Sequence, residues 1–204
     1  MKNRLFTGVL SLSLLAGASS AQEAYKNEAT VSAIGSFQQT ANGNGIQQSA
    51  NDGAGVLVSY RYFFTNHQGV ELNYGFTRFD QQFNSPGTSL GAFSVPANTN
   101  EATASYIYKF GIGHRLTPFV SAGTGALIFV PQNSFAVNNV SGSRFATPDF
   151  VYSAGADFAL TRRVSLRLGY RGHVFEAPDF GIGGLNTGSV AHLAQPFGGL
   201  SFHF

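Results

Sequence analysis

Hydrophobic and polar residues alternate with a period of two along most of this chain. A period of two puts successive side chains on opposite faces of a β-strand. Eight segments show this alternation, three of them more weakly: 29–37, 53–64, 69–80, 102–112, 118–130, 150–160, 164–174 and 192–204. Strands of this length are long enough to cross a bilayer when they are tilted. The pattern therefore predicts an all-β chain of eight strands.

The connections between these segments alternate between short and long. Short turns are expected near Asn66, His114 and Arg162. Long polar loops are expected at 39–52, 81–100, 131–147 and 176–190. Short turns at one end and long loops at the other are typical of an eight-stranded antiparallel up-and-down transmembrane β-barrel. In that class we expect the long loops, near Asn44, Ser89, Asn139 and Gly184, to face outside the cell and the short turns the periplasm.

The two strand faces distinguish this barrel from a soluble one of the lipocalin kind. One face is apolar, and the other holds mostly small residues with few charges, whereas a face in contact with water carries many charges. Large aromatic residues near the strand ends are typical of membrane-interface girdles. We assign Tyr62, Phe64, Phe150 and Phe175 to such girdles. Both features favour the membrane barrel over the soluble alternative.

The first 21 residues form a secretory signal pattern. Lys2 and Arg4 precede an apolar run, and Ser19 and Ala21 are the small residues before a cleavage site. This pattern predicts removal of residues 1–21, with residues 22–204 as the barrel. Removing the two basic residues leaves 10 of the 12 Lys and Arg against 10 Asp and Glu. No net charge then draws the chain toward polyanions, so we expect no nucleic-acid partner.

The chain ends in GLSFHF, with Leu200, Phe202 and Phe204 on one strand face. This ending and the stretch 163–175 (RVSLRLGYRGHVF) resemble the bacterial outer-membrane β-barrel proteins of the OmpA-like transmembrane-domain type. The resemblance implies an outer-membrane location after secretion to the periplasm, contact with outer-membrane lipid, and a monomer. It also implies that the last three apolar residues are the signal to the barrel-assembly machinery. No peptidoglycan-binding domain follows, so cell-wall anchoring is not expected.

Charges on the polar face are expected to form a cluster inside the barrel. Symmetric hairpins around the short turns place Arg61 opposite Glu71 and Asp157 opposite Arg167, with Lys109 near that layer. Arg171 and His173 follow one or two steps further along. The interior of an eight-stranded barrel is just wide enough for side chains to fill it, and an unpaired charge there is costly. We interpret the cluster as a polar plug; a proton or ion path is the alternative.

Motifs that carry chemistry are weak in this chain. Residues 87–91 match G-x-S-x-G, but the motif needs a strand-to-helix turn that an all-β chain does not supply. The five histidines show no zinc-site spacing, and the chain has no Cys. His192 is the one residue to weigh for a lipid-modifying membrane enzyme, and no Ser–Asn motif flanks it. We expect no catalytic, metal or cofactor site, and a non-enzymatic structural or surface-interaction role through the long loops. The alternatives are a narrow pore for ions or small solutes and a lipid-modifying enzyme.

Overall fold

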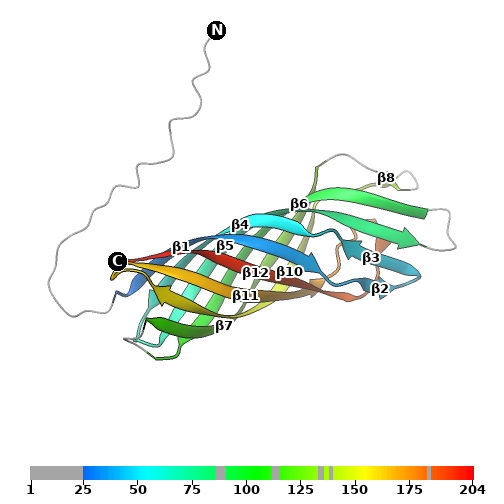
Figure 1. Cartoon of the computed structure of the whole chain (residues 1–204). Helices are drawn as coiled ribbons and strands as arrows, with labels where there is room; N and C mark the ends of the chain where they lie inside the picture. The colour runs from blue at the N-terminus through cyan, green and yellow to red at the C-terminus, as the bar shows by residue number, and fades with distance from the viewer. Residues whose placement is uncertain (1–24, 86–90, 112–114, 133–135, 138–139, 183–184) are drawn as a thin grey trace, which may run out of the picture.

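Eight long antiparallel strands close into a barrel in this computed structural model, which describes residues 25–85, 91–111, 115–132, 136–137, 140–182 and 185–204 (Figure 1). The barrel strands are β1 (Asn27–Gln38), β4 (Gly53–Phe63), β5 (Gln68–Ser85), β6 (Gly91–Lys109), β7 (Leu116–Pro131), β10 (Phe145–Ala159), β11 (Val164–Glu176) and β12 (Val190–His203). Each pairs with the next along the chain, and β12 pairs with β1 to close the cylinder. The predicted fold class and strand order are confirmed. Within the described ranges, no helix has the length and apolar character to cross a membrane.

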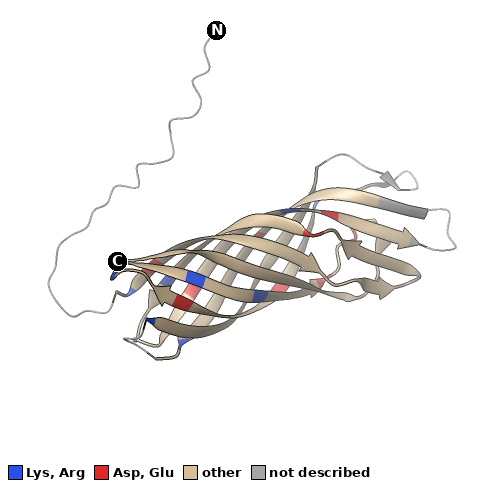
Figure 2. Ribbon diagram, in the orientation of Figure 1, with Lys and Arg blue, Asp and Glu red and all other residues tan. Residues whose placement is uncertain are grey.

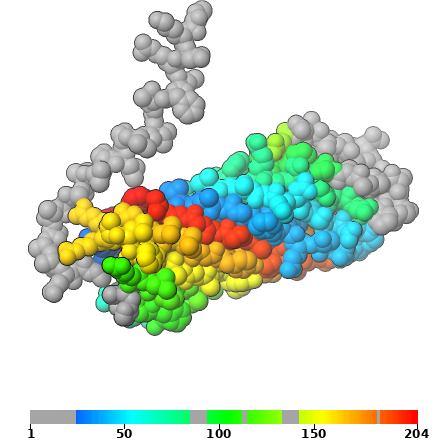
Figure 3. Space-filling view, in the orientation of Figure 1, coloured from blue at the N-terminus to red at the C-terminus, as the bar shows by residue number. Residues whose placement is uncertain are grey.

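The two ends of the barrel differ in their connections. Residues 64–67 and 160–163 form short turns, at the end where the chain terminates (Figure 1). We call this the turn end and the opposite end the loop end. The predicted turns at Asn66 and Arg162 lie there, whereas His114 lies outside the described residues. Figure 3 shows the long, continuous side wall that joins the two ends.

Three of the four predicted loops contain strands, so those predictions were wrong in part. Segment 81–100 continues β5 and β6 as one long hairpin, and only its tip at 86–90 lies outside the described residues. Segment 39–52 holds the short strands β2 (Ala41–Gly43) and β3 (Ile46–Ala50). Segment 131–147 includes the pair β8 (Ala136–Val137) and β9 (Val140–Ser141), and β10 begins inside it.

A tight turn explains the unexpected β2–β3 hairpin. Asn44 and Gly45 both have positive φ angles, of 50° and 76°. Two consecutive residues with positive φ are the mark of a type I′ turn, for which Asn-Gly is the preferred sequence. The turn allows β3 to pair with the part of β5 nearest the loop end, from Gln47 opposite Asn84 to Ala50 opposite Gln81. In this part β4 no longer pairs with β5, and β3 takes its place at the edge of β5.

The outer wall of the barrel is an apolar band. Its large side chains are exposed, as a lipid-facing surface requires. They include Val31, Val56, Val58, Tyr60, Tyr62, Phe64, Val70, Leu72, Tyr74, Phe76, Tyr106, Phe110, Val120, Phe150, Phe158, Leu168, Leu200 and Phe202. Phe175 is the exception to the predicted girdle. It is buried in the interior, because it shares the inward strand parity of Arg171 and His173 on β11.

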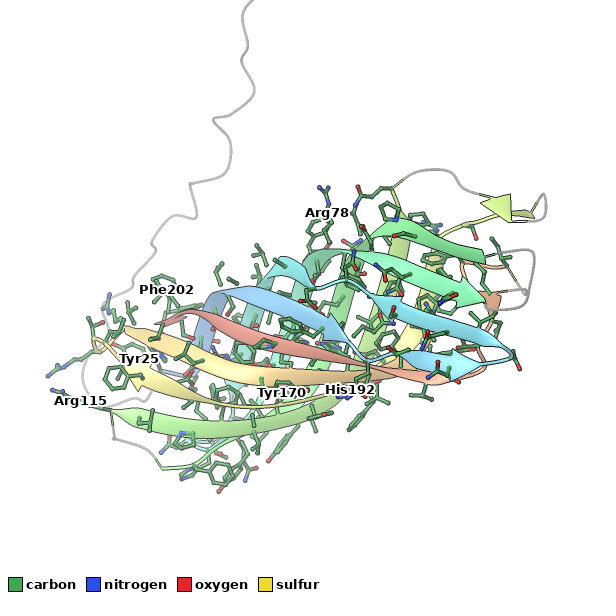
Figure 4. All side chains as sticks on the ribbon, turned by 45° about the vertical axis from the view of Figure 1, so that its right-hand side comes forward. Tyr25, Arg78, Arg115, Tyr170, His192 and Phe202 are labelled. Carbon is green, nitrogen blue, oxygen red and sulfur yellow. The ribbon has the colours of Figure 1, made fainter. Side chains whose placement is uncertain are left out.

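The β5–β6 hairpin reverses the two faces near the loop end. On β5 the outward positions beyond Phe76 become polar, starting with the exposed Arg78 (Figure 4). The inward positions become mostly apolar at the same level: Phe79 and Phe83 are buried, and the buried Gln81 between them accepts a hydrogen bond from Gln48. A reversal of this kind is expected where a strand leaves lipid for water, because the outer face then meets solvent and the inner face forms a hydrophobic core.

Candidate functional site in the barrel interior

Charged side chains from six strands converge inside the turn end; we call this group the turn-end charge cluster. It consists of Glu28 on β1, Arg61 on β4, Glu71 on β5, Lys109 on β6, Asp157 on β10 and Arg167 on β11. All six are buried, and three acids face three bases. Charged positions on the ribbon of the barrel wall are marked in Figure 2. Equal numbers of opposite charges are what a poorly hydrated interior can hold.

Arg61 is the centre of this cluster. In the strand register Arg61 lies between two carboxylates, opposite Glu28 on one side and Glu71 on the other. Its guanidinium lies 2.7 Å from Glu28, 3.5 Å from Asp157 and 3.6 Å from Glu71. It also donates hydrogen bonds to the hydroxyls of Thr30 and Ser201. The side chain is 0% exposed, so three carboxylates replace the water that it loses.

Lys109 on β6 and Arg167 on β11 complete the cluster. Lys109 Nζ lies 2.5 Å from Glu28 Oε1 and 3.3 Å from Asp157 Oδ2. Arg167 lies 3.1 Å from Glu71 and 3.2 Å from Asp157, and its guanidinium stacks over the Phe119 ring at 3.5 Å. Each carboxylate therefore has at least two basic partners within 4 Å, and Asp157 has three, which makes the cluster a network rather than a set of pairs.

A second polar layer lies further from the turn end. Arg171 contacts Glu101 at 2.5 Å, and the imidazole of His173 contacts Asp149 at 2.6 Å. The amide of Gln195 joins the two pairs. Its oxygen lies 2.9 Å from His173 Nε2 and accepts a hydrogen bond from Arg171, and its nitrogen donates to Glu101. Arg171, which the sequence analysis includes among the interior charges one or two steps beyond that layer, lies in this second layer and has a partner of its own.

The loop end of the interior is mainly apolar, although the buried Gln48 and Gln81 form a hydrogen bond there. Fifteen buried side chains form this core, which we call the apolar cap: Ala41, Ile46, Phe79, Phe83, Val95, Ala97, Leu127, Phe129, Phe175, Ala177, Phe180, Ile182, Leu185, Ala191 and Leu193. Members come from β2, β3 and the segment between β11 and β12 as well as from the barrel strands. The cap therefore closes the cylinder at the end opposite to the turn-end charge cluster.

Three interior carboxylates escaped the sequence analysis for one reason. Glu28, Glu101 and Asp149 each lie one residue before the start of a predicted strand. Extending each strand by one step would have given them the inward parity, because positions two residues apart share a face. The register of Arg61 with Glu71 and of Asp157 with Arg167 agrees with the symmetric hairpins that the spacing predicts.

Two adjoining hollows open at the turn end, of about 400 and 440 Å³. Both reach Lys109 and His203, whose imidazole contacts Glu28 at 3.0 Å. The buried network around Arg61 lies beyond them. Water can thus enter the barrel from the turn end as far as the turn-end charge cluster, above which the second polar layer and the apolar cap fill the interior.

Candidate catalytic residues do not gather into a site among the described residues. His192 faces outward (Figure 4). Its Nε2 lies 2.8 Å from the hydroxyl of Tyr152, whose ring lies close over Gly172. His67 contacts the backbone oxygen of Lys109. The described chain contains no group of three or more His, Cys, Asp or Glu that could hold a metal ion. Of the G-x-S-x-G match, residues 87–90 lie outside the described ranges.

Leu200 and Phe202 lie on β12 at the seam of the barrel, and Phe204 directly follows the strand. All three side chains are exposed on the lipid-facing wall. The backbone of Phe204 pairs with that of Asn27 through two hydrogen bonds of 2.9 and 3.2 Å. The terminal residue thus closes the ladder between β12 and β1 at the turn end.

Comparisons with solved structures give the same fold. The structure of Neisserial surface protein A (NspA) is 15% identical, with a TM-score of 0.61, over 90% of this chain and 100% of that one. OprG from Pseudomonas aeruginosa is 13% identical, with a TM-score of 0.61, over 88% and 96% of the two chains. Ail from Yersinia pestis is 16% identical, with a TM-score of 0.50, over 88% and 99%.

A comparison with protein families identifies the chain more directly. A search of curated proteins finds no match. The family model described as "Outer membrane protein beta-barrel domain" matches residues 8–191. This match covers most of the chain, and the closed eight-stranded barrel agrees with it. The chain therefore belongs to the outer membrane protein beta-barrel domain family and is a β-barrel protein of the bacterial outer membrane.

Proposed function

We propose that this protein is a non-conducting barrel with a structural or surface-interaction role, rather than a pore or an enzyme. The filled interior carries the proposal. Two polar layers and the apolar cap occupy the cylinder in sequence, and Arg61, His173 and Phe129 are each 0% exposed. An eight-stranded barrel leaves little room beyond its own side chains, so no wide aqueous path remains.

The loop end is proposed to face outside the cell. Beyond Phe76 the outer face of β5 is polar, so the upper β5–β6 hairpin stands in water rather than in lipid. Long connections lie outside and short turns face the periplasm in this class of barrel. The hairpin is held on both sides: β3 pairs with β5, and β7 pairs with β6 up to Ala97 opposite Pro131.

The outward surface of this hairpin is polar and ordered by its own hydrogen bonds. Arg78 donates to Asn98 at 3.2 Å, and Gln132 donates to the same amide oxygen at 3.2 Å. Such a surface suits contact with another macromolecule, because loops on a rigid scaffold are the usual place for recognition. This polar surface supports a surface-interaction role for the hairpin.

Charge at the loop end bears on the kind of partner. The Ail structure contains sucrose octasulfate, a heparin analogue. In this chain the acids Asp52, Asp80, Glu176 and Asp179 outnumber the bases Arg78 and Arg144 among the described loop-end residues. An excess of acids repels sulfated polyanions. We therefore favour an uncharged or basic partner for this chain.

Ion conductance in planar bilayers tests the proposal. The full barrel, reconstituted from detergent, is expected to add no current steps above those of the bare bilayer. A trimeric porin in the same bilayers is the positive control, and retention of the compact form on unheated gels shows that the barrel is folded. Reproducible steps from the folded protein would overturn the proposal in favour of the narrow pore. Altered lipid A in cells that express it would overturn it in favour of the enzyme.

A further inference from the structure

Four basic residues ring the turn end of the barrel; we call them the basic rim. Lys26 precedes β1, Arg115 precedes β7, and Arg162 and Arg163 form the β10–β11 turn. In Figure 4 Arg115 points away from the barrel at this end. Outside the interior, the described residues of the turn end include no Asp or Glu. The turn end is therefore strongly basic.

The rim cations differ from those inside the barrel in having no partner. Each interior cation contacts at least one carboxylate within 4 Å. Within the described part of the chain, no ion pair or side-chain hydrogen bond involves Lys26, Arg115 or the guanidinium groups of Arg162 and Arg163. Their positive charge is available to a ligand.

The rim lies at the edge of the lipid-facing band. Lys26 follows Tyr25, Arg115 precedes Leu116, and Arg163 precedes Val164. Tyr25 and Leu116 are exposed on the outer wall. Long basic side chains next to such residues extend from the hydrocarbon edge to the polar headgroups. The four charges therefore lie at headgroup depth.

The hollows at this end combine cations with apolar side chains. The first is lined by Lys26 and Arg162 together with Tyr25 and Phe64. The second is lined by Arg115 and Arg162 together with Leu160. The carboxylates at their floor, Glu28 and Asp157, are already paired with Lys109 and Arg61. An anionic amphiphile fits this combination better than a free anion, because its acyl chains can cover the apolar side chains.

We propose that the basic rim binds the phosphate headgroups of anionic phospholipids. On the proposed orientation these lipids belong to the periplasmic leaflet, whereas headgroup binding itself does not depend on orientation. The loop end, where acids outnumber bases, does not share the property. The rim thus gives the barrel a lipid preference at one end only.

Association with spin-labelled phosphatidylglycerol tests the proposal. The full chain is folded into phosphatidylcholine vesicles, and its preference for the labelled anionic lipid over labelled phosphatidylcholine is measured by electron paramagnetic resonance. The variant carries Lys26→Gln, Arg115→Gln, Arg162→Gln and Arg163→Gln. The matched control carries Arg78→Gln and Arg144→Gln, which neutralise exposed cations at the loop end. Compact migration on unheated gels confirms folding of each.

The expected result is a preference in the parent that is lost in the rim variant and kept in the control. Each cation in contact with a headgroup should raise the association constant for the anionic lipid about fivefold at low salt. No preference in the parent, or an equal preference in the rim variant, would overturn the proposal. Inorganic phosphate and chloride are compared as competitors at equal ionic strength. If phosphate displaces more of the labelled lipid than chloride does, the rim is a site for free phosphate instead. None of these outcomes alters the conductance test, so the two proposals fail separately.

Discussion

Removing Arg61 should expose how the turn-end charge cluster holds the barrel together. The substitution Arg61→Met leaves Glu28, Glu71 and Asp157 with Lys109 and Arg167 as the remaining Lys and Arg partners. One buried carboxylate then lacks a counter-charge. Breaking a buried pair by deleting one partner typically costs about 3–5 kcal/mol. We expect Arg61→Met to lower the free energy of unfolding by an amount in this range.

The geometry ranks the partners of Arg61. Glu28 lies 2.7 Å from its guanidinium, whereas Glu71 lies 3.6 Å away and has Arg167 at 3.1 Å. A double variant with Glu28→Gln restores the balance at two acids and two bases. Its loss of unfolding free energy should therefore be smaller than the sum of the two single-variant losses by about 2 kcal/mol. The same comparison for Arg61→Met with Glu71→Gln should give a difference of about 1 kcal/mol. These values separate a shared network from a single Arg61–Glu71 pair.

Urea unfolding in lipid vesicles provides the measurement. The chain has no Trp, so the folded fraction is followed by the migration of unheated samples on gels. The control cycle combines Arg61→Met with Asp149→Asn, which lies in the second polar layer and contacts His173 instead. That pair should be additive within about 0.5 kcal/mol. Additive losses for Arg61 with Glu28 would refute the network.

Three further changes probe other parts of the barrel. Phe129→Ala in the apolar cap should lower the free energy of unfolding by about 3–5 kcal/mol. The control Ile128→Ala, at the neighbouring outward-facing position, should lower it far less in the same urea assay. Equal losses for the two variants would contradict an apolar core at the loop end. Gly172→Ala should lower the urea midpoint because its Cβ overlaps the Tyr152 ring and breaks the bond to His192, while Gly198→Ala, near only the end of Leu168, serves as the tolerated control. Deleting Phe204 should reduce the yield in the outer membrane without reducing secretion, whereas Phe204→Ala, which keeps the two backbone hydrogen bonds to Asn27, tells whether the ring itself is recognised.

The period-two pattern was sufficient for the strand number and for most of the inward and outward assignments. Such a pattern is reliable where lipid lies on one side, because every lipid-facing position must then be apolar. The register of the hairpins could also be predicted, since short turns constrain which residues oppose each other. Arg61 opposite Glu71 is the example.

The boundaries of strands were harder to predict than their faces. Polarity suggested a loop over 81–100, yet the alternation continues there with the faces reversed, as Phe79, Phe83 and Val95 inside show. This reversal could not be predicted while the interior was expected to be polar along the whole length of the barrel. Phe175 was assigned to the outer girdle, although it lies two residues after His173 and therefore shares its inward parity.

The partners of the interior charges depend on the three-dimensional closure of the barrel. Glu28 and Arg167 lie on strands far apart in sequence, and both reach the same cluster across the interior. No spacing along the chain gives such contacts. Sequence reasoning could therefore name several charges of the turn-end charge cluster but not the order of their pairing.

Cysteine accessibility in intact cells decides which end of the barrel faces outward. The chain has no Cys, so Gln47→Cys at the loop end and Asn66→Cys at the turn end each introduce one exposed thiol. An impermeant thiol reagent should label position 47 in intact cells and position 66 only after lysis. Labelling of position 66 but not of position 47 in intact cells would contradict the proposed orientation and remove the hairpin surface from the cell exterior.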